Sequence, residues 1–282
     1  MTVAPAPEIT PDAGSMVSVG GVDTWVHDLG AGAPVMLLHG SGPGVSAFAN
    51  WRLTMPALVA AGHRVIAPDQ LGFGRTVPPA GHDYGLDSWV EHAIGVLDAV
   101  GLERVGLVGN SFGGAVALAL ASRHPERVER LVLMGSVGVE FELTPGLDAV
   151  WGYEPSVEAM HELLRIFAYG QSLVSGDLAK IRYEASIADG AQDRFGAMFP
   201  APRQRWVTAM ATPDEQIRAV SQPALIVHGR DDQVIPLETS LRLHELLDDS
   251  ELHVFGRCGH WTQIERTAQF NALLTRFFAQ TS

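Results

Sequence analysis

A serine lies in a glycine-rich turn, Gly109-Asn-Ser-Phe-Gly-Gly114. This G-x-S-x-G pattern directly follows an apolar run at residues 105–108 and directly precedes a segment rich in alanine and leucine. A sharp turn from a strand into a helix lifts a serine hydroxyl above the edge of a sheet, and the glycines leave room for neighbouring backbone. The pattern therefore predicts that Ser111 is a nucleophile, although by itself it also fits an unreactive serine in a strand–helix turn.

An aspartate and a histidine follow two later apolar runs. Asp232 lies behind residues 224–228, and His260 lies behind residues 251–255. Because the carboxyl ends of parallel strands meet at one edge of a sheet, we expect both side chains near Ser111. In such a triad the histidine takes the serine proton and the aspartate orients the histidine. Each residue alone also fits an ordinary loop, and the combination in this order indicates the triad.

Two neighbouring acids compete for the third place in this triad. Asp232 lies three residues after Gly229 and four before Pro236, which is the usual position of the acid in loops of this kind. The sequence therefore favours Asp232, and Asp231 is expected to be a surface or turn residue.

Backbone N–H groups that could bind an oxyanion lie in two places. One is the N–H of Phe112 at the start of the expected helix, and the other is the loop His39-Gly-Ser-Gly-Pro-Gly44, with Ser41 as the expected donor. A phosphate-binding loop is the alternative interpretation, but no Lys-Ser or Lys-Thr pair follows. His39 itself is expected to be a hydrogen-bonding core residue rather than a catalyst.

The elements that must position these residues alternate along the chain. The expected buried strands are residues 34–38, 64–68, 105–108, 131–134, 224–228 and 251–255. The expected helices between and after them are residues 89–100, 113–123, 237–247 and 267–278. Continuous apolar runs, rather than alternating ones, indicate parallel strands covered on both faces. The sequence therefore predicts an α/β fold with a doubly wound, mostly parallel sheet.

This alternation stops between about residues 139 and 213. Helical patterns occur there at residues 156–169 and 177–187, but no clear strand does. We therefore expect a helical cap inserted between two sheet strands. The predicted organisation is a loose N-terminal tail at residues 1–15, a core made of residues 16–138 and 214–282, and a cap at residues 139–213.

Composition and charge exclude several classes of protein. The chain has 19 Lys and Arg against 32 Asp and Glu, and the net charge of −13 disfavours nucleic-acid and anionic-membrane partners. A hydrophobic fraction of 46% excludes wholesale disorder. The single cysteine, Cys258, allows no intrachain disulfide and no cysteine-based zinc site, and we expect no metal. Neither a signal-peptide pattern nor an apolar stretch of ~20 residues is present, so a cytoplasmic protein is expected.

Taken together, these motifs make the chain resemble the α/β-hydrolases, and more narrowly the meta-cleavage product hydrolases of bacterial aromatic degradation. The resemblance runs from about Val17 to Phe278 and is closest to the branch acting on 2-hydroxymuconic semialdehyde and its small 6-alkyl relatives. Its most specific pieces are His39-Gly-Ser-Gly-Pro-Gly-Val-Ser-Ala-Phe-Ala-Asn-Trp51, Gly109-Asn-Ser-Phe-Gly-Gly114 and Gly259-His-Trp261. It implies a capped α/β-hydrolase fold that hydrolyses a carbon–carbon bond in a vinylogous 1,5-diketone. The implied products are 2-hydroxypenta-2,4-dienoate and a small acid. We expect no cofactor, and a homo-oligomer that is a dimer or larger.

Roles carried over from this resemblance fall to particular residues. Ser111, Asp232 and His260 form the triad, and the N–H groups of Ser41 and Phe112 form the oxyanion hole. The residues that match the family's ligands for the carboxylate and 2-oxo end of the substrate are Asn50, Asn110, Arg182 and Trp261. Without the resemblance, Asn50 also fits a helix cap, Arg182 a surface helix residue and Trp261 simple packing.

The distal group at C6 of the substrate needs an apolar pocket. From their positions in the cap and behind strand ends, the expected wall residues are Val137, Leu147, Trp151, Val207, Val234 and Ile235. Walls of this bulk suit hydrogen or a short alkyl group at C6 and disfavour a phenyl ring. The competing functions are a carboxylesterase or lactonase with the same triad and, from another class, a ligand-binding receptor on this scaffold.

Overall fold

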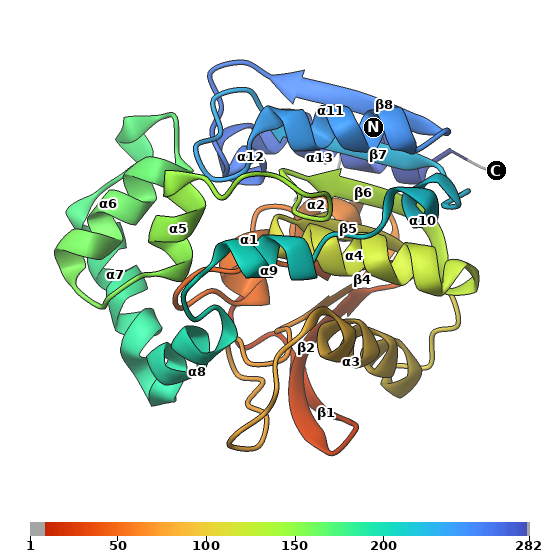
Figure 1. Ribbon diagram of the computed structural model, residues 1–282. Coiled ribbons are helices and arrows are strands. Elements are labelled where there is room, and N and C mark those ends of the chain that lie inside the picture. Colours follow the sequence, from red (N-terminus) through yellow and green to blue (C-terminus); the bar gives the residue numbers. More distant parts are fainter. Residues whose placement is uncertain (1–8, 281–282) are drawn as a thin grey trace.

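The computed structural model describes residues 9–280, and within them the chain folds around one mostly parallel sheet (Figure 1). Its strands are β1 (Ser15–Val19), β2 (Val22–Gly30), β3 (Ala33–Leu38), β4 (His63–Pro68), β5 (Val105–Asn110), β6 (Val128–Met134), β7 (Ala224–Gly229) and β8 (Ser250–Phe255). They lie in the order β1-β2-β4-β3-β5-β6-β7-β8. The pairs β1–β2 and β2–β4 are antiparallel and the others are parallel. The predicted doubly wound α/β fold is confirmed.

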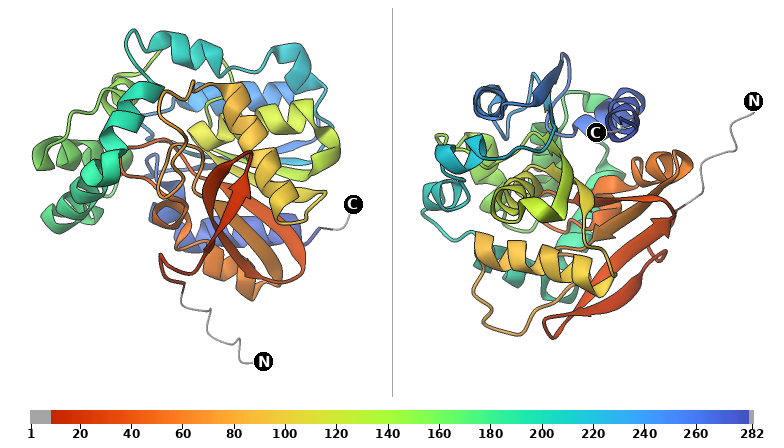
Figure 2. Two further views of the ribbon diagram at one scale, coloured as in Figure 1. Left: turned by 90° about the horizontal axis from the view of Figure 1, so that it is seen from below. Right: turned by 90° about the vertical axis from the view of Figure 1, so that its right-hand side faces the viewer.

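Helices cover both faces of this sheet (Figure 2). The core helices are α1 (Ala47–Trp51), α2 (Met55–Ala60), α3 (Leu86–Ala99), α4 (Phe112–Arg123), α11 (Leu237–Leu246), α12 (Thr262–Glu265) and α13 (Thr267–Phe278). Along β3, Met36 and Leu38 join the apolar cluster that contains α3 and α4, whereas Val35 and Leu37 join the cluster that contains α2 and α13. Both faces of each central strand are therefore buried, which is why these strands have continuous apolar runs.

The N-terminal hairpin of β1 and β2 was not expected from the sequence. Its first strand falls at the end of the segment predicted to be a loose tail, and residues 9–14 before it are also held in place. Ala13 accepts a hydrogen bond of 2.7 Å from His27 Nδ1, and Asp12 pairs with Arg75 at 2.5 Å. The tail prediction is therefore wrong for residues 9–15, because β1 is short and half-exposed and gives little apolar signal. Residues 1–8 of that prediction lie outside the described part of the chain.

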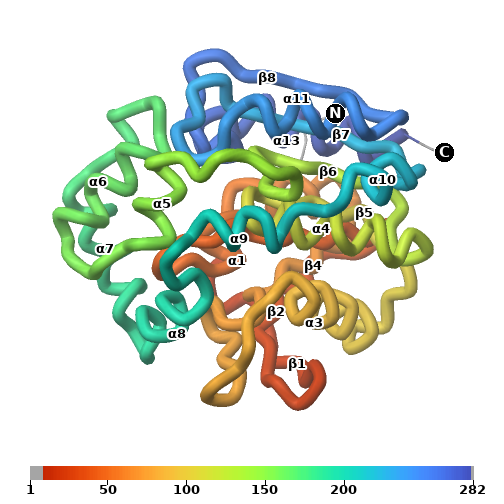
Figure 3. The backbone as a smooth tube through the Cα atoms, viewed as in Figure 1, coloured from red at the N-terminus to blue at the C-terminus, as the bar shows by residue number. Residues whose placement is uncertain are grey.

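Most of the helices between β6 and β7 form a lobe at the carboxyl ends of the strands, whereas the last two lie over the core (Figure 1). They are α5 (Pro145–Trp151), α6 (Val157–Phe167), α7 (Gly176–Ile187), α8 (Ala191–Met198), α9 (Gln204–Ala209) and α10 (Asp214–Arg218). The chain leaves β6, passes through α5 to α8 and returns across α4 through α9 and α10 (Figure 3). Thr212 N donates to Gly138 O at 2.9 Å, so the two ends of the inserted segment meet beside the sheet. No helix among residues 9–280 is long and apolar enough to cross a membrane.

Candidate active site

Ser111 lies at the junction of β5 and α4 in a strained backbone conformation, with φ 53° and ψ −116°. A positive φ is unfavourable for a residue with a side chain and persists only where the surroundings fix it. Here Ser111 N donates to Met134 O at 2.9 Å, and Ser111 O accepts from Val137 N at 3.1 Å. A Cβ on Gly113 would collide with the carbonyl of Leu38, so the close approach requires glycine there. The backbone thus holds the serine on a tight elbow at the end of the strand.

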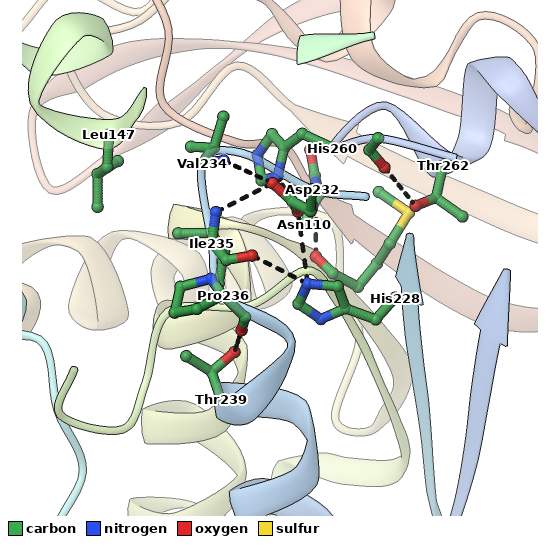
Figure 4. A network of polar contacts seen from close by, with 12 residues as sticks. Asn110, Leu147, His228, Asp232, Val234, Ile235, Pro236, Thr239, His260 and Thr262 are labelled. Carbon is green, nitrogen blue, oxygen red and sulfur yellow. Dashed lines mark hydrogen bonds and ion pairs between the residues drawn. The ribbon is translucent and has the colours of Figure 1, made fainter. Parts of the chain in front are cut away.

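His260 and Asp232 form a direct pair next to this elbow (Figure 4). His260 Nδ1 lies 2.7 Å from Asp232 Oδ2. The other carboxylate oxygen accepts the N–H groups of Val234 and Ile235 at 2.7 and 3.0 Å. With Nδ1 donating to the carboxylate, Nε2 of His260 is left free to accept a proton.

Burial raises the pKa of Asp232, but the charge and hydrogen bond of His260 outweigh it, and the net pKa is lowered. The acid therefore stays ionised although it is almost fully buried. A Cβ on Gly135 would lie 3.2 Å from Asp232 Oδ2 and 3.4 Å from His260 Nδ1. Gly135 follows Met134, the residue that fixes Ser111, so the segment behind β6 touches all three predicted triad positions.

Asp231, the competing acid, has a different place. Its Oδ2 accepts the N–H of Arg257 at 2.8 Å, so this carboxylate connects the loop behind β7 with the loop behind β8. It lies in a turn on the surface side of the site, and Asp232 is the acid that reaches the histidine.

The loop behind β3 lies directly against the elbow. A Cβ on Gly40 would be 3.3 Å from the Cβ of Ser111. His39 has both ring nitrogens occupied: Nδ1 donates to Gly40 O at 2.8 Å, and Nε2 accepts the N–H of Gln70 at 3.0 Å. Burial lowers the pKa of His39, which keeps the ring neutral in this role. Phe112 is the first residue of α4, and its N–H is one of those that no intrahelical carbonyl can accept.

A cavity of about 230 Å³ brings together three of the predicted polar residues. Asn50, Arg182 and Trp261 line it, together with Arg52 and Gln263. Asn50 Nδ2, Arg182 Nε and Gln263 Oε1 are buried without a hydrogen-bond partner in the described structure. Burial, and then repulsion from Arg52, lower the pKa of Arg182 to about 10. Unpartnered buried donors beside a guanidinium are suited to bind a carboxylate.

The fourth predicted polar residue, Asn110, does not line this cavity. Its side chain is buried beside the oxyanion loop, where Nδ2 donates to Met134 O at 3.3 Å and Oδ1 would lie 3.0 Å from a Cβ on Gly40. Asn110 therefore lies between the elbow and the loop rather than at the open end of the site.

The six residues expected around the distal group all belong to one buried apolar cluster. Leu147 comes from α5 of the cap and Val234 from the Asp232 loop (Figure 4). Trp151 is more than a wall residue, because its Nε1 donates a buried hydrogen bond of 3.0 Å to Ser41 Oγ. Its ring also stacks on Phe199, with centroids 4.5 Å apart and planes 9° apart.

Comparison with known proteins agrees with this geometry. The model of the alpha/beta hydrolase fold family matches residues 33–160 and 169–267. A 2-hydroxy-6-oxo-2,4-heptadienoate hydrolase of Pseudomonas putida is 60% identical over 96% of this chain and 98% of its own length. A 2-hydroxymuconate semialdehyde hydrolase of a Pseudomonas species is 57% identical over 98% of this chain and 97% of its own length. The solved structure of a mutant meta-cleavage product hydrolase from Pseudomonas fluorescens, complexed with acetates, superposes with a TM-score of 0.93 at 57% identity, covering 95% of this chain and 98% of that one.

The chain belongs to the meta-cleavage product hydrolases. It is therefore a hydrolase of the α/β fold that acts on carbon–carbon bonds.

Glu265 is a residue of this hydrolase that sequence reasoning missed. Its Oε1 accepts the N–H of Gly259 at 2.7 Å, and its Oε2 accepts the N–H of Gly170 at 2.8 Å. One carboxylate thus joins the loop that carries the histidine to the segment of the cap behind α6. Trp261 and Phe167 reinforce the connection by stacking with centroids 5.1 Å apart. The sequence shows only an acid in a short helix, which is no signal for such a bridge.

His228, at the end of β7, is a second missed residue of the hydrolase. Its Nε2 donates to Ile235 O at 3.1 Å (Figure 4), and its Nδ1 accepts the hydroxyl of Ser240 at 2.6 Å. Burial lowers the pKa of His228, so the ring is neutral and holds the turn that presents Asp232. Because His228 ends an apolar run, the sequence indicates only a strand residue and gives no sign that its side chain holds this turn.

Proposed function

We propose that this hydrolase cleaves 2-hydroxymuconic semialdehyde and its short 6-alkyl homologues. Water is added across the bond between C5 and C6, which yields 2-hydroxypenta-2,4-dienoate and formate or a short carboxylic acid. The observation that carries the proposal is the polar cavity with Arg182 and its unpartnered neighbours beside a serine–histidine–aspartate arrangement. A simple esterase has no need of a buried arginine at this end of its site.

The substrate binds with its carboxylate on Arg182, whose planar guanidinium can donate two parallel hydrogen bonds. Asn50 and Trp261 add donors from the cavity wall, and Asn110 lies nearer the elbow, toward the 2-oxo group. This end of the substrate is thereby fixed, and the C6 carbonyl reaches the oxyanion loop.

The bond is broken in steps that balance protons and charge. His260, whose positive charge is stabilised by Asp232, first takes the proton of the substrate's 2-hydroxyl group and delivers it to C5, which gives the 2-oxo tautomer. Ser111 then loses its proton to His260 and attacks the C6 carbonyl, and the N–H groups of Ser41 and Phe112 bind the resulting oxyanion. The C5–C6 bond breaks as its electron pair enters the dienolate, whose 2-oxygen takes the proton back from His260 so that the product leaves as the hydroxydienoate. Water activated by His260 then releases the acid from Ser111.

The distal residues limit the size of the C6 substituent in this proposal. We place this group among six buried apolar residues of the core cluster: Val137, Leu147, Trp151, Val207, Val234 and Ile235. Filling such a region with a phenyl ring requires repacking, whereas hydrogen or methyl does not.

We also propose that the hydrolase works in the cytoplasm as a homo-oligomer. Cys258 is buried, and burial raises the pKa of its thiol to about 11, as suits a structural thiol in a reducing compartment. The edge strand β8 pairs only with β7 among the described strands and exposes Val254. A backbone edge of this kind is a suitable contact for a second copy.

The test is to mix the protein with the yellow ring-fission product of catechol and follow the loss of colour and the release of formate. Arg182→Gln is expected to raise KM and lower kcat/KM on this substrate. It should act much less on p-nitrophenyl acetate, which has no carboxylate. Absence of cleavage by the wild-type protein would refute the proposal, and turnover of neutral esters alone would favour an esterase. Binding without turnover would favour a receptor.

A further inference from the structure

Two arginines line the same cavity without an acid to balance them. Arg52 follows α1, and Arg182 lies on α7 in the cap. The residues that line the cavity include neither an aspartate nor a glutamate. Two guanidinium groups from different parts of the fold therefore share one space with no carboxylate on its walls.

Neither arginine forms an ion pair with a described acid. Arg52 Nη1 donates to Ala49 O at 2.7 Å, and Arg182 Nη2 donates to Pro43 O at 3.5 Å. Eight arginines elsewhere in the described part do pair with acids: Arg64, Arg75, Arg123, Arg127, Arg203, Arg230, Arg242 and Arg276. Other described arginines also form no ion pair, and Arg52 and Arg182 are distinguished from them because both line one cavity that has no acid on its walls.

Placing two like charges together has an energetic cost, and a bound anion offsets it. Burial lowers the pKa of Arg52, and Arg52 in turn contributes to the lowered pKa of Arg182. The protein as a whole carries a net charge of −13, which repels an anionic substrate at long range. A local positive potential in the cavity counteracts this repulsion and raises the rate of productive encounter.

We propose that Arg52 is a second recognition residue of this site, one that recruits and retains anionic dienoates while Arg182 fixes their carboxylate. The inference rests on the proposed function for the identity of the dienoate. It assigns to Arg52 a role in affinity and association and no role in bond cleavage.

The test compares Arg52→Gln with Arg218→Gln, a matched control. Arg218 is exposed on α10, does not line the cavity and carries the same charge, so both variants change the net charge equally. At low salt, Arg52→Gln is expected to raise KM for the dienoate about tenfold with little change in kcat, and to flatten the dependence of kcat/KM on NaCl. The loss on the dienoate should be several times larger than any loss on p-nitrophenyl acetate. Arg52→Lys keeps the charge and should restore the salt dependence.

Equal behaviour of Arg52→Gln and Arg218→Gln would overturn the inference. Equal losses on the dienoate and the neutral ester, not restored by lysine, would also overturn it, because they indicate a structural role.

Titration calorimetry with sorbate, a stable anionic dienoate, separates this inference from the proposed function. We expect weaker sorbate binding to Arg52→Gln than to the wild type or Arg218→Gln. If the wild type does not cleave the ring-fission product, the proposed function fails, and sorbate binding still decides the role of Arg52. Equal sorbate affinity in all three proteins would refute the inference even if cleavage is observed.

Discussion

The hydrogen bond between Trp151 and Ser41 connects the cap to the loop that is proposed to bind the oxyanion. Both side chains are buried, and the distance from Nε1 to Oγ is 3.0 Å. Trp151→Phe removes the donor and keeps an aromatic ring that can still stack on Phe199. Ser41→Ala removes the acceptor and keeps the backbone N–H that the mechanism uses.

The size of the effect follows from the burial of the pair. A neutral buried hydrogen bond contributes about 1 kcal/mol net, and a buried group left without its partner costs about 1–3 kcal/mol. Trp151→Phe also leaves a small cavity, so we expect a loss of about 2–3 kcal/mol in the free energy of unfolding. Ser41→Ala should lose about 1–2 kcal/mol. In the double variant neither group is left unpartnered, so its loss should be smaller than the sum by about 1 kcal/mol.

A double-mutant cycle measures this coupling. Urea unfolding gives the stability of the four proteins, and steady-state hydrolysis of the ring-fission product gives kcat. Because a misplaced donor weakens transition-state binding, we expect kcat to fall about fivefold in Trp151→Phe, equivalent to about 1 kcal/mol. Strictly additive losses in both stability and kcat would refute the idea that this bond positions the loop.

The other predictions concern the nucleophile, the distal pocket, a buried histidine and the bridge to the cap. Ser111→Ala is expected to lower kcat by several powers of ten with an unchanged circular dichroism spectrum, and near-normal cleavage would end the assignment. The 6-phenyl dienoate should have a much lower kcat/KM than the 6-hydrogen and 6-methyl compounds; if it were the best of the three, the pocket would be misassigned. Burial lowers the pKa of His92 to about 4. Between about pH 6.5 and pH 4 the unfolded chain therefore binds a proton at this residue, whereas the folded protein does not. The free energy of unfolding should thus fall by roughly 3 kcal/mol from this group as pH drops from about 6.5 to about 4. Urea unfolding at pH 7 and pH 4.5 should show a smaller loss in His92→Gln, and identical losses would contradict it. Glu265→Gln keeps an acceptor for only one of its two N–H partners, so hydrogen exchange at Gly170 should accelerate, and unchanged exchange there would contradict the bridge.

The fold and the elbow were predictable because their signals are local. Strands buried on both faces need continuous apolar runs, as in β3 and β5, and the helix α4 is apolar all round because it is buried all round. Close backbone contacts next to Ser111 require glycine at positions 109 and 113, so the glycines in the sequence indicate the tight turn. The spacing of Asp232 from Gly229 likewise identified which of two acids faces the histidine.

Only the tertiary structure could decide the contacts between distant segments. Trp151 and Ser41 are 110 residues apart, and Glu265 and Gly170 are 95 residues apart. Arg52 follows a short core helix and Arg182 lies on a cap helix, and nothing in either neighbourhood of the sequence indicates that they share a cavity. A hydrogen bond or a repulsion between such groups depends on how the cap packs on the sheet. The sequence by itself determined the fold and which residues are proposed to do the chemistry, whereas the packing of the cap determined which other residues surround the proposed site and contribute to its charge.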